Sequence, residues 1–508
     1  MSFTPARLFG GLVLGAGLVV AAHPAQAAAS CEGLTTLTPS PGGAPLQVTL
    51  AKPVAAGAFT APGPDGPPGA TSPYASLPAF CRVAITLKPG PKSDVKAEVW
   101  MPASGWNGKL QVVGNGGFAG TIGYRALATA LAGGYAAAST DTGHTGPAAN
   151  TFATEDATLD FAYRAIHETA VAAKKAVDGF YGAAPKFAYF NGCSTGGRQA
   201  LTAAQRYPDD FTGIVGGAPA IYTTKQAYGQ LWFYQAIAVG EGAIPKEKLP
   251  LIHEAVLAAC DGLDGAKDGV LENPLACTFD PGVLACKAGA APASCLTPPQ
   301  VESVRRIYAG ASHATTHEKI FPGLERGSEL GWSPVPVSYA VDYFKHIVFK
   351  NASWDPSTLN FGSDVAEAYP AANQIFDAND PRLGAFTSRG GKLLMYQGWA
   401  EPGIPPGHVV NYYAAVKAHT EGAASAVRLF MVPGMGHCGG GDGASTFDMV
   451  AALDKWVESG TPPEQIPASR VRAGKVDRTR PLCAYPKYAR YSGSGDMKDA
   501  ASFTCTQP

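Results

Sequence analysis

A serine flanked by two glycines is the first group in this chain whose type and spacing could do chemistry. Gly192-Cys193-Ser194-Thr195-Gly196 has the pattern G-x-S-x-G, and it lies between an apolar run typical of a buried strand and a helix-forming run that extends to Arg206. In this context the pattern forms a sharp turn that exposes the serine hydroxyl as a nucleophile. The backbone N–H of Thr195 would then point toward a developing oxyanion. The alternative is a glycine-rich loop without chemistry.

Two later residues have the types that would activate this serine. In folds with such a turn, the catalytic acid and then a histidine follow the nucleophile in chain order. His437 follows a predicted strand in a glycine-rich turn, and Glu401 follows the preceding predicted strand. His437 would accept the proton of Ser194, and Glu401 would orient the imidazole and stabilise its cation. Asp377 and Asp380 are the alternatives for the acid.

A glycine-rich loop earlier in the chain could supply a second donor to the oxyanion. The loop at 114–120 follows a predicted buried strand at 109–113. Glycine lets the backbone approach a substrate oxygen closely, and esterases use similar loops in their oxyanion holes. We predict the N–H of Gly117, or alternatively that of Gly116, as the donor. A phosphate-binding loop is disfavoured because no Gly-Lys-Ser/Thr sequence follows.

The chain has ten cysteines. In an exported chain, an even number of cysteines implies disulfides rather than free thiols. Sequence alone does not fix the connectivity, and metal binding is disfavoured because no C-x-x-C pair occurs. Pairing of neighbours leaves Cys193 and Cys438 for each other, and this bond would tie Ser194 to His437. The remaining expected pairs are Cys31–Cys81, Cys260–Cys277, Cys286–Cys295 and Cys483–Cys505.

An acidic loop at 260–277 has residues suited to a hard cation, because Ca²⁺ prefers carboxylate and carbonyl oxygens. The loop is not an EF-hand, since its twelfth position would be Leu275. We predict a structural calcium ion, and the alternative is a solvated acidic turn. The expected ligands are the carboxylates of Asp261, Asp264 and Asp268 and the carbonyl oxygens of Ala266 and Val270.

Strands and helices alternate on both sides of a long insertion, which indicates an α/β fold with a mostly parallel sheet. We predict an α/β-hydrolase core formed by 28–220 and 391–508, and a large inserted lid domain at 221–390, composed of polar loops and aromatic clusters. The expected strands outside the serine turn are 46–50, 81–87, 95–100, 109–113, 134–140, 213–215, 393–397 and 427–432, and the expected helices are 156–181, 408–419 and 447–459.

The N-terminus has the features of an export signal. Arg7 precedes an apolar run at 8–22, and Ala25-Gln26-Ala27 fits a small-residue cleavage site. We therefore predict a signal peptide at 1–27 and a secreted or periplasmic protein, with a retained anchor as the alternative. The net charge of −1 gives no argument for a nucleic-acid partner, and no later segment has the length and apolarity of a membrane span.

These motifs together resemble the tannase/feruloyl esterase family, which includes mono(hydroxyethyl) terephthalate hydrolases. The resemblance extends from about Cys31 to the C-terminus, and it implies a lid with structural Ca²⁺, a disulfide beside the triad and hydrolysis of aromatic esters. It also agrees with the five cysteine pairs. The family usually has an aspartate where Glu401 stands and often a histidine where Gln397 stands. The motifs that carry the resemblance are at 113–120, 141–144, 192–199, 261–270, 436–438 and 480–483.

The predicted function is that of a secreted serine carboxylesterase. Its substrate would be a small ester of a hydroxycinnamic, gallic or similar aromatic acid, derived from plant cell walls or polyphenols. The glutamate at position 401 motivates an alternative, a non-catalytic protein that binds aromatic ligands on a hydrolase scaffold. A metal-dependent hydrolase that uses the acidic loop is a further alternative.

Overall fold

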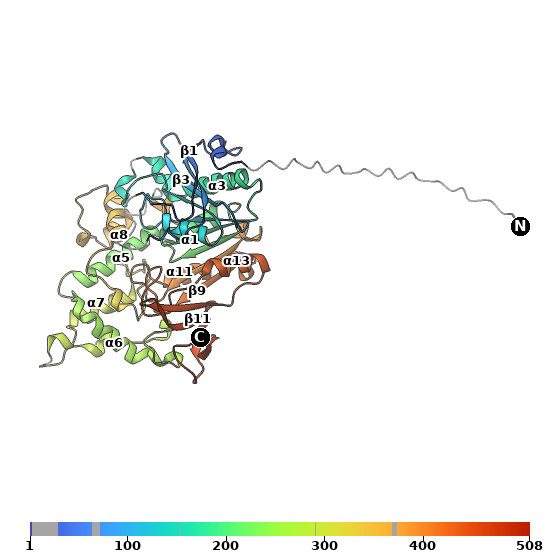
Figure 1. Ribbon diagram of the computed structural model, residues 1–508. Coiled ribbons are helices and arrows are strands. Elements are labelled where there is room, and N and C mark those ends of the chain that lie inside the picture. Colours follow the sequence, from blue (N-terminus) through green and yellow to red (C-terminus); the bar gives the residue numbers. More distant parts are fainter. Residues whose placement is uncertain (3–28, 63–71, 153, 290, 368–372) are drawn as a thin grey trace.

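The computed structural model describes residues 1–2, 29–62, 72–152, 154–289, 291–367 and 373–508. The predicted signal peptide lies outside these residues except for its first two positions. In this part of the chain, no helix has the length and apolarity needed to cross a membrane. The described residues are organised around one large sheet with helices on both of its faces (Figure 1).

Across the described residues, the large sheet has nine strands in the order β1-β2-β3-β5-β4-β6-β7-β8-β9. The strands from β5 to β9 in this order are parallel, whereas β1, β2 and β3 join the edge as antiparallel neighbours. The structure therefore confirms the predicted α/β class. The strands are β1 (Leu46–Val54), β2 (Phe80–Leu87), β3 (Val95–Pro102), β4 (Lys109–Val113), β5 (Ala136–Thr140), β6 (Phe187–Cys193), β7 (Gly213–Gly217), β8 (Lys392–Gly398) and β9 (Val427–Val432).

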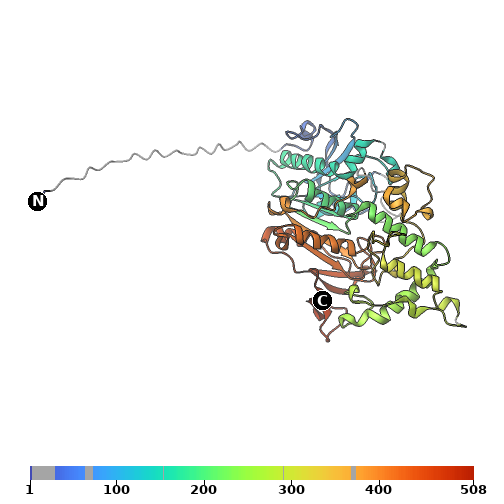
Figure 2. The same ribbon diagram turned by 180° about the vertical axis from the view of Figure 1, so that it is seen from behind.

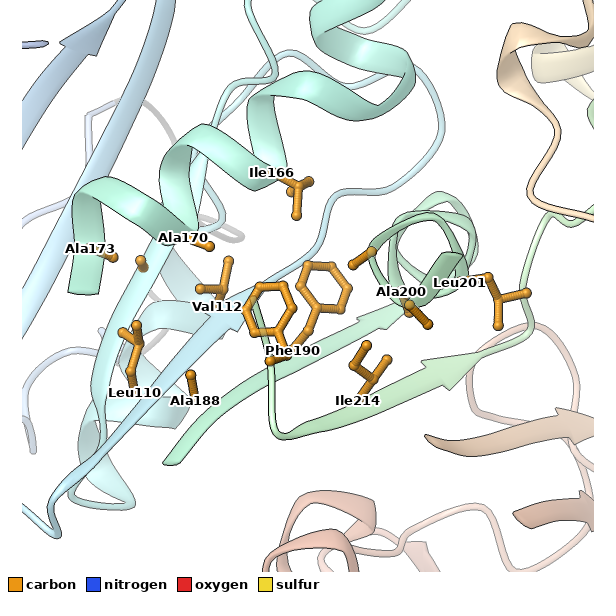
Figure 3. Packing of buried hydrophobic residues seen from close by; sticks show 14 of the residues in the cluster. Leu110, Val112, Ile166, Ala170, Ala173, Ala188, Phe190, Ala200, Leu201 and Ile214 are labelled. Carbon is orange, nitrogen blue, oxygen red and sulfur yellow. The ribbon is translucent and has the colours of Figure 1, made fainter. Parts of the chain in front are cut away.

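Successive side chains of the parallel strands face two different helix layers, as the two-residue period of a strand requires. Phe190 and Ile214 pack under α3 and α4 on one face (Figure 3). Tyr189 and Val215, one position away, pack with α13 on the other face. The first face is covered by α3 (Ala165–Tyr181), α4 (Thr195–Arg206) and α11 (Gly407–His419), and the second by α1 (Tyr124–Ala132) and α13 (Met449–Ser459).

The helix predicted at 156–181 is present but contains a π-helical turn. It runs from α2 (Glu155–Leu159) through a wider turn at Asp160–Arg164 into α3. The carbonyl oxygens of Phe161 and Ala162 in this turn accept hydrogen bonds from Arg198 at 3.1 and 2.6 Å. Arg198 lies on the helix after Ser194 and is 0 % exposed. The π turn thus provides acceptors for a buried guanidinium behind the serine.

The described residues between β7 and β8 add no strand to the large sheet; they contain the predicted loops, and also helices that were not predicted. Residues such as Ile252, Val256 and Ile307 form a separate apolar cluster, which explains why helices are stable there. The boundaries of a lid domain stay a prediction. The helices are α5 (Thr223–Ala238), α6 (Leu249–Cys260), α7 (Pro298–Ala309), α8 (Ser338–Asp342), α9 (Ser363–Glu367) and α10 (Gly384–Thr387).

Two small antiparallel sheets at the C-terminus were not predicted. One pairs β10 (Gln465–Arg472) with β11 (Lys475–Cys483), and the other pairs β12 (Tyr488–Tyr491) with β13 (Phe503–Thr506). Both views of the molecule place these strands beside the α6 end of the insertion (Figures 1 and 2). The C-terminal segment therefore closes against the acidic loop that follows α6. A short helix, α12 (Ala423–Ala426), precedes β9.

Candidate active site

Ser194 lies at the sharp turn between β6 and α4. Its backbone has φ 65° and ψ −120°, which is a strained conformation for a residue with a side chain. A Cβ atom at Gly192 would lie 2.7 Å from the backbone of Gly196, so this position must be glycine. The N–H of Ser194 donates to the carbonyl of Gly217 at 2.9 Å, which fixes the turn to β7. This geometry is that of a nucleophile elbow.

The residues next to Ser194 and next to His437 are covalently joined. Cys193 and Cys438 form a disulfide with Cα atoms 6.0 Å apart, although 245 positions separate them in the sequence. Cys438 has a φ of 60°, so both Ser194 and the partner of Cys193 adopt left-handed backbone conformations. All five predicted cysteine pairs are confirmed, and each of the ten cysteines lies within the described residues.

Glu401 holds the imidazole of His437. Its Oε2 lies 2.7 Å from His437 Nδ1, and its Oε1 accepts the backbone N–H groups of Gly403 at 2.9 Å and Ile404 at 3.1 Å. Glu401 is 0 % exposed. A carboxylate can only accept hydrogen bonds, so Nδ1 carries the proton and Nε2 is left with a lone pair. The pair therefore presents a base on the far side of the ring.

The alternative acids have other partners. Asp377 accepts the backbone N–H of Thr223 at 2.8 Å, and Asp380 forms an ion pair with Arg382 at 2.8 Å. Neither carboxylate contacts His437 among the described residues. The geometry thus favours Glu401 over both aspartates as the partner of the imidazole.

The electrostatics of His437 suit a general base. Burial lowers the pKa of the imidazole, but the hydrogen bond and the charge of Glu401 outweigh burial and raise the pKa of His437 above its ordinary value of 6.5. The side chain of His437 is 40 % exposed, so a substrate can reach it. The described residues show no hydrogen bond between Ser194 Oγ and His437. In unliganded hydrolases this contact is often long and shortens when substrate binds.

The glycine-rich loop after β4 lies against the serine turn. Thr195 Oγ1 donates to the carbonyl of Gly117 at 2.8 Å, and Gly117 has a φ of 53°. The N–H of Asn115 donates to Gln199 on α4 at 3.0 Å. Within the described residues, the backbone N–H groups of Thr195, Gly116 and Gly117 donate to no protein acceptor. They are therefore available to a substrate oxygen, and both predicted alternatives for the second donor stay open.

His144, whose role the sequence did not reveal, holds the same loop from behind. Its Nε2 donates to the carbonyl of Phe118 at 2.7 Å, and Gly120 donates to the carbonyl of Gly146 at 2.8 Å. A Cβ atom at Gly120 would overlap the carbonyl of His144. Burial lowers the pKa of His144, so the ring is neutral and keeps one N–H for Phe118. The only signal was the motif at 141–144, which ends a strand.

An aromatic contact connects the insertion to this loop. The ring of Phe118 stacks on that of Tyr339 from α8, with centroids 4.2 Å apart and an interplanar angle of 8°. Phe118 is buried and belongs to the same apolar cluster as Tyr343 and Phe344, and Tyr339 packs against this cluster. The insertion therefore packs aromatic side chains against the predicted oxyanion loop through this cluster.

Comparison with known proteins gives the family. A family model described as "Tannase and feruloyl esterase" matches residues 81–506. The chain belongs to this family. It is accordingly a carboxylic ester hydrolase, and its fold is of the α/β-hydrolase type. The resemblance inferred from the motifs is confirmed.

Several relatives of this esterase cover nearly its whole length. It is 38% identical, over 95% of its chain and 92% of the relative, to an uncharacterized esterase of Xanthomonas campestris pv. campestris. It is 32% identical to a probable feruloyl esterase B-1 of Aspergillus oryzae, with 86% of each chain covered. The solved feruloyl esterase B of Aspergillus oryzae has a TM-score of 0.84 and 30% identity, covering 91% of this chain and 97% of that one. A tannin acyl hydrolase of Aspergillus niger, with a TM-score of 0.75 and 21% identity over 93% of both chains, shares the fold.

The acidic loop of the esterase lies between α6 and the C-terminal strands, with the side chains of Asp261 and Asp264 buried. Asp261 accepts the backbone N–H groups of Gly269 and Val270, and Asp264 accepts that of Ala266 at 2.8 Å. Asp268 forms an ion pair with Arg480 of β11. In the described parts of the chain, no three acidic, histidine or cysteine side chains gather around one point. The carboxylates of the loop therefore bind mainly backbone N–H groups of the loop itself and the guanidinium of Arg480.

The charges in this loop nevertheless suit a cation. Burial raises the pKa of Asp261, raises that of Asp264 to about 6 and raises that of Glu272 to about 8. Buried carboxylates with raised pKa values are destabilised as anions, and a bound divalent cation relieves this cost. The available donors, carboxylates together with carbonyl oxygens, are of the kind that calcium prefers. The donor chemistry fits Ca²⁺, and Arg480 binds Oδ2 of Asp268, one of its two carboxylate oxygens.

Proposed function

We propose that this esterase uses Ser194 as a nucleophile to hydrolyse esters of aromatic acids of the hydroxycinnamic or gallic type. One observation carries the proposal: His437 Nδ1 is held by buried Glu401 at 2.7 Å, while a disulfide ties the neighbour of His437 to the neighbour of Ser194. The arrangement leaves the basic Nε2 and the hydroxyl on linked backbones. This is the combination that a serine hydrolase requires.

The reaction follows from the positions of these groups. His437 Nε2 takes the proton of Ser194 Oγ as the oxygen attacks the ester carbonyl, and the N–H groups of Thr195 and Gly117 or Gly116 stabilise the oxyanion. The imidazolium then protonates the leaving alcohol, and the acyl group stays on Ser194. Water, deprotonated by His437, attacks the acyl-enzyme and releases the acid. Glu401 stabilises the imidazolium in both halves of the reaction.

The aromatic acyl group is supported by two observations. Relatives with at least 30% identity carry the name feruloyl esterase. In this chain Phe118, next to the predicted donor Gly117, stacks on Tyr339, and this ring pair would support an aromatic wall for the acyl group. The substrate would be a small aromatic ester of plant cell-wall or polyphenol origin. Family membership argues against the non-catalytic alternative.

We also propose that the protein is exported and that it binds a structural calcium ion. Export to the periplasm or the exterior is supported by the five disulfides, which persist in oxidising compartments. A structural Ca²⁺ would be held by Asp261, Asp264 and Asp268 with the carbonyl oxygens of Ala266 and Val270. Such an ion would neutralise the buried carboxylates and stabilise the loop without taking part in the reaction.

The test is turnover of methyl ferulate and methyl gallate by the full chain and by a Ser194→Ala variant. We expect the wild-type chain to hydrolyse at least one of the two esters and the variant to lose turnover by several orders of magnitude, with unchanged thermal unfolding. Turnover that survives in the variant would assign the reaction to another group.

A further inference from the structure

A small cavity lies between the insertion and the loop that carries His437. Its volume is about 250 Å³, and His437, Trp399 and Pro402 line it from the sheet side. His253 of α6 and Arg326 line it from the insertion. The residues that line it do not include Ser194, Gly117 or Phe118. The cavity therefore borders the predicted base but not the predicted oxyanion donors.

Arg326 is the charged group in this cavity that lacks an acidic partner. Its Nε donates to the carbonyl of Phe279 at 3.0 Å, and its guanidinium lies over the ring of Tyr308 at 4.6 Å. Within the described residues no carboxylate forms an ion pair with it. Its terminal N–H groups have no protein acceptor in the same part of the structure. A half-buried guanidinium with free donors is suited to bind a carboxylate in a two-pronged manner.

The carboxylates near the cavity have partners other than Arg326 among the described residues: Glu329 binds His253, and Glu401 binds His437. Asp442, which also lines the cavity, is already paired with Arg472 at 2.6 Å. Glu325, next to Arg326 in the chain, is partly buried, and burial raises its pKa to about 7. Among the described residues, Arg326 therefore keeps N–H donors that are free to bind an anion in the cavity.

His253 is held much as His437 is. Its Nδ1 lies 2.8 Å from Oε2 of Glu329, which is 0 % exposed, and Oε1 of Glu329 accepts the hydroxyl of Tyr308 at 2.8 Å. With Nδ1 donating to a carboxylate, Nε2 of His253 is left for a partner in the cavity. Glu329 thus holds His253 directly. It also holds Tyr308, the ring over which the guanidinium of Arg326 lies.

The position of the cavity identifies which part of an ester it could hold. In a serine esterase the histidine protonates the leaving oxygen, so the alcohol part lies on the histidine side of the reacting carbon. The acyl part and its oxyanion lie toward the N–H donors. A cavity that borders His437 but not the donors lies on the alcohol side. Its volume is below that of sites for drug-sized ligands, so it suits a small alcohol.

We propose that this cavity binds the alcohol part of the substrate and selects alcohols that carry a carboxylate, such as small hydroxy acids, with Arg326 as the recognising residue. The inference rests on the proposed esterase function and adds the class of leaving group to it. The reaction itself is unchanged: the bond between the acyl carbon and the alcohol oxygen breaks, and His437 supplies the proton to that oxygen. Arg326 would bind the carboxylate.

The experiment compares two esters that differ in one charge. One is the ester of ferulic acid with the hydroxyl of lactic acid, and the other is the same compound with the lactate carboxyl methylated. The ratio of their kcat/KM values is measured for the wild-type chain, Arg326→Gln, Arg326→Lys and the control Arg305→Gln, an exposed arginine on α7 paired with Asp280. The ratio is taken within each protein, so it does not depend on the fraction that is folded.

We expect Arg326→Gln to lower the ratio by roughly ten- to hundredfold, the range for losing hydrogen bonds to a charged group. Arg326→Lys should give an intermediate ratio, because lysine keeps the charge without the planar fork. The Arg305→Gln ratio should equal that of the wild type. An unchanged ratio in Arg326→Gln overturns the inference while leaving the esterase function intact. Failure of the wild type to hydrolyse these esters and methyl ferulate overturns both.

Discussion

The disulfide between Cys193 and Cys438 joins the residue before Ser194 to the residue after His437. It connects the turn after β6 with the loop after β9. In the sheet, β7 and β8 lie between these two strands. Hydrophobic packing positions strands, but the loops after them are freer to move. A covalent bond between the two loops limits how far hydroxyl and imidazole can separate. We therefore infer that this bond has a role in catalysis as well as in stability.

Replacing both cysteines by serine should reduce stability and turnover together. Closing a loop of 245 residues is worth on the order of 5 kcal/mol in the chain-entropy model. Loss of positioning should also lower kcat by roughly a hundredfold, as misplacement of a reacting group by about 1 Å can do. Denaturant unfolding and steady-state kinetics of the double variant measure the two effects.

The matched control is the double serine variant of Cys483 and Cys505, a pair in the C-terminal strands. This variant should lose stability but keep its kcat per folded molecule. Equal kcat values for the two double variants would contradict a catalytic role for the Cys193–Cys438 bond.

Glu401→Gln should lower kcat by about 10⁴-fold, because an amide can donate to Nδ1 and favour the wrong imidazole tautomer. Glu401→Asp should be milder but still damaging. The backbone N–H groups of Gly403 and Ile404 hold Oε1 where it is, and the shorter side chain cannot reach both them and His437. Steady-state kinetics of both variants measure these changes in kcat. A nearly normal rate in Glu401→Gln would move the acid role elsewhere, with Asp377 the next candidate.

The pH dependence of kcat/KM should report His437. Only the neutral imidazole can accept the serine proton, so the rate must fall as the pH drops through the pKa of His437. Glu401 raises this pKa, so the acid limb of the profile should lie above pH 6.5. In Glu401→Gln the raising charge is absent, and the limb should move to lower pH. A limb in the same place in both proteins would show that another group titrates.

Thr195 should act through its side chain as well as its N–H. Its hydroxyl donates to the carbonyl of Gly117, so Thr195→Val removes the bond that fixes the glycine loop against the turn. We expect kcat to fall by roughly tenfold or more with a smaller change in KM, since oxyanion donors act mainly in the transition state. Thr195→Ser keeps the hydroxyl and should restore most of the rate. Equal rates for the valine and serine variants would exclude this positioning role.

Removal of Ca²⁺ should destabilise the protein without changing its chemistry. A ligand present at a hundred times its Kd adds about 2.7 kcal/mol to the free energy of unfolding. A chelator should therefore lower the Tm, and added Ca²⁺ should restore it. The Asp264→Asn variant should have the lower Tm with or without chelator. A Tm that does not change with chelator would contradict calcium binding and would attribute the stability of the loop to its backbone hydrogen bonds and to Arg478 and Arg480.

Much of the sheet could be predicted from the sequence because its central strands, such as β4, β5 and β7, are buried on both faces and are therefore near-continuous apolar runs. The predicted bounds of 109–113 and 427–432 coincide with β4 and β9. The order of the two residues after Ser194, each following a predicted strand, was also sufficient to predict the pair of Glu401 and His437. Strands β10 and β11 at the C-terminus were not predicted, and the reason is physical. Pro467 and Pro481 face each other in the β10–β11 ladder, and proline is normally a signal against a strand.

Other features depend on contacts that no local pattern encodes. His144 reaches the carbonyl of Phe118 across 26 positions, and Arg480 reaches Asp268 across 212. The acidic loop was interpreted without the arginine that binds it, because the two segments meet only in the folded chain. The helices of the insertion were missed because their apolar side chains are interspersed with the polar loops on which the prediction rested.

The most direct test of the account is covalent labelling of the wild-type chain with a fluorophosphonate, followed by peptide mass spectrometry. A serine activated by His437 and Glu401 should take up one equivalent of the probe at Ser194, and His437→Ala should abolish the labelling. No adduct on the wild-type chain, or an adduct at a residue other than Ser194, would contradict the account.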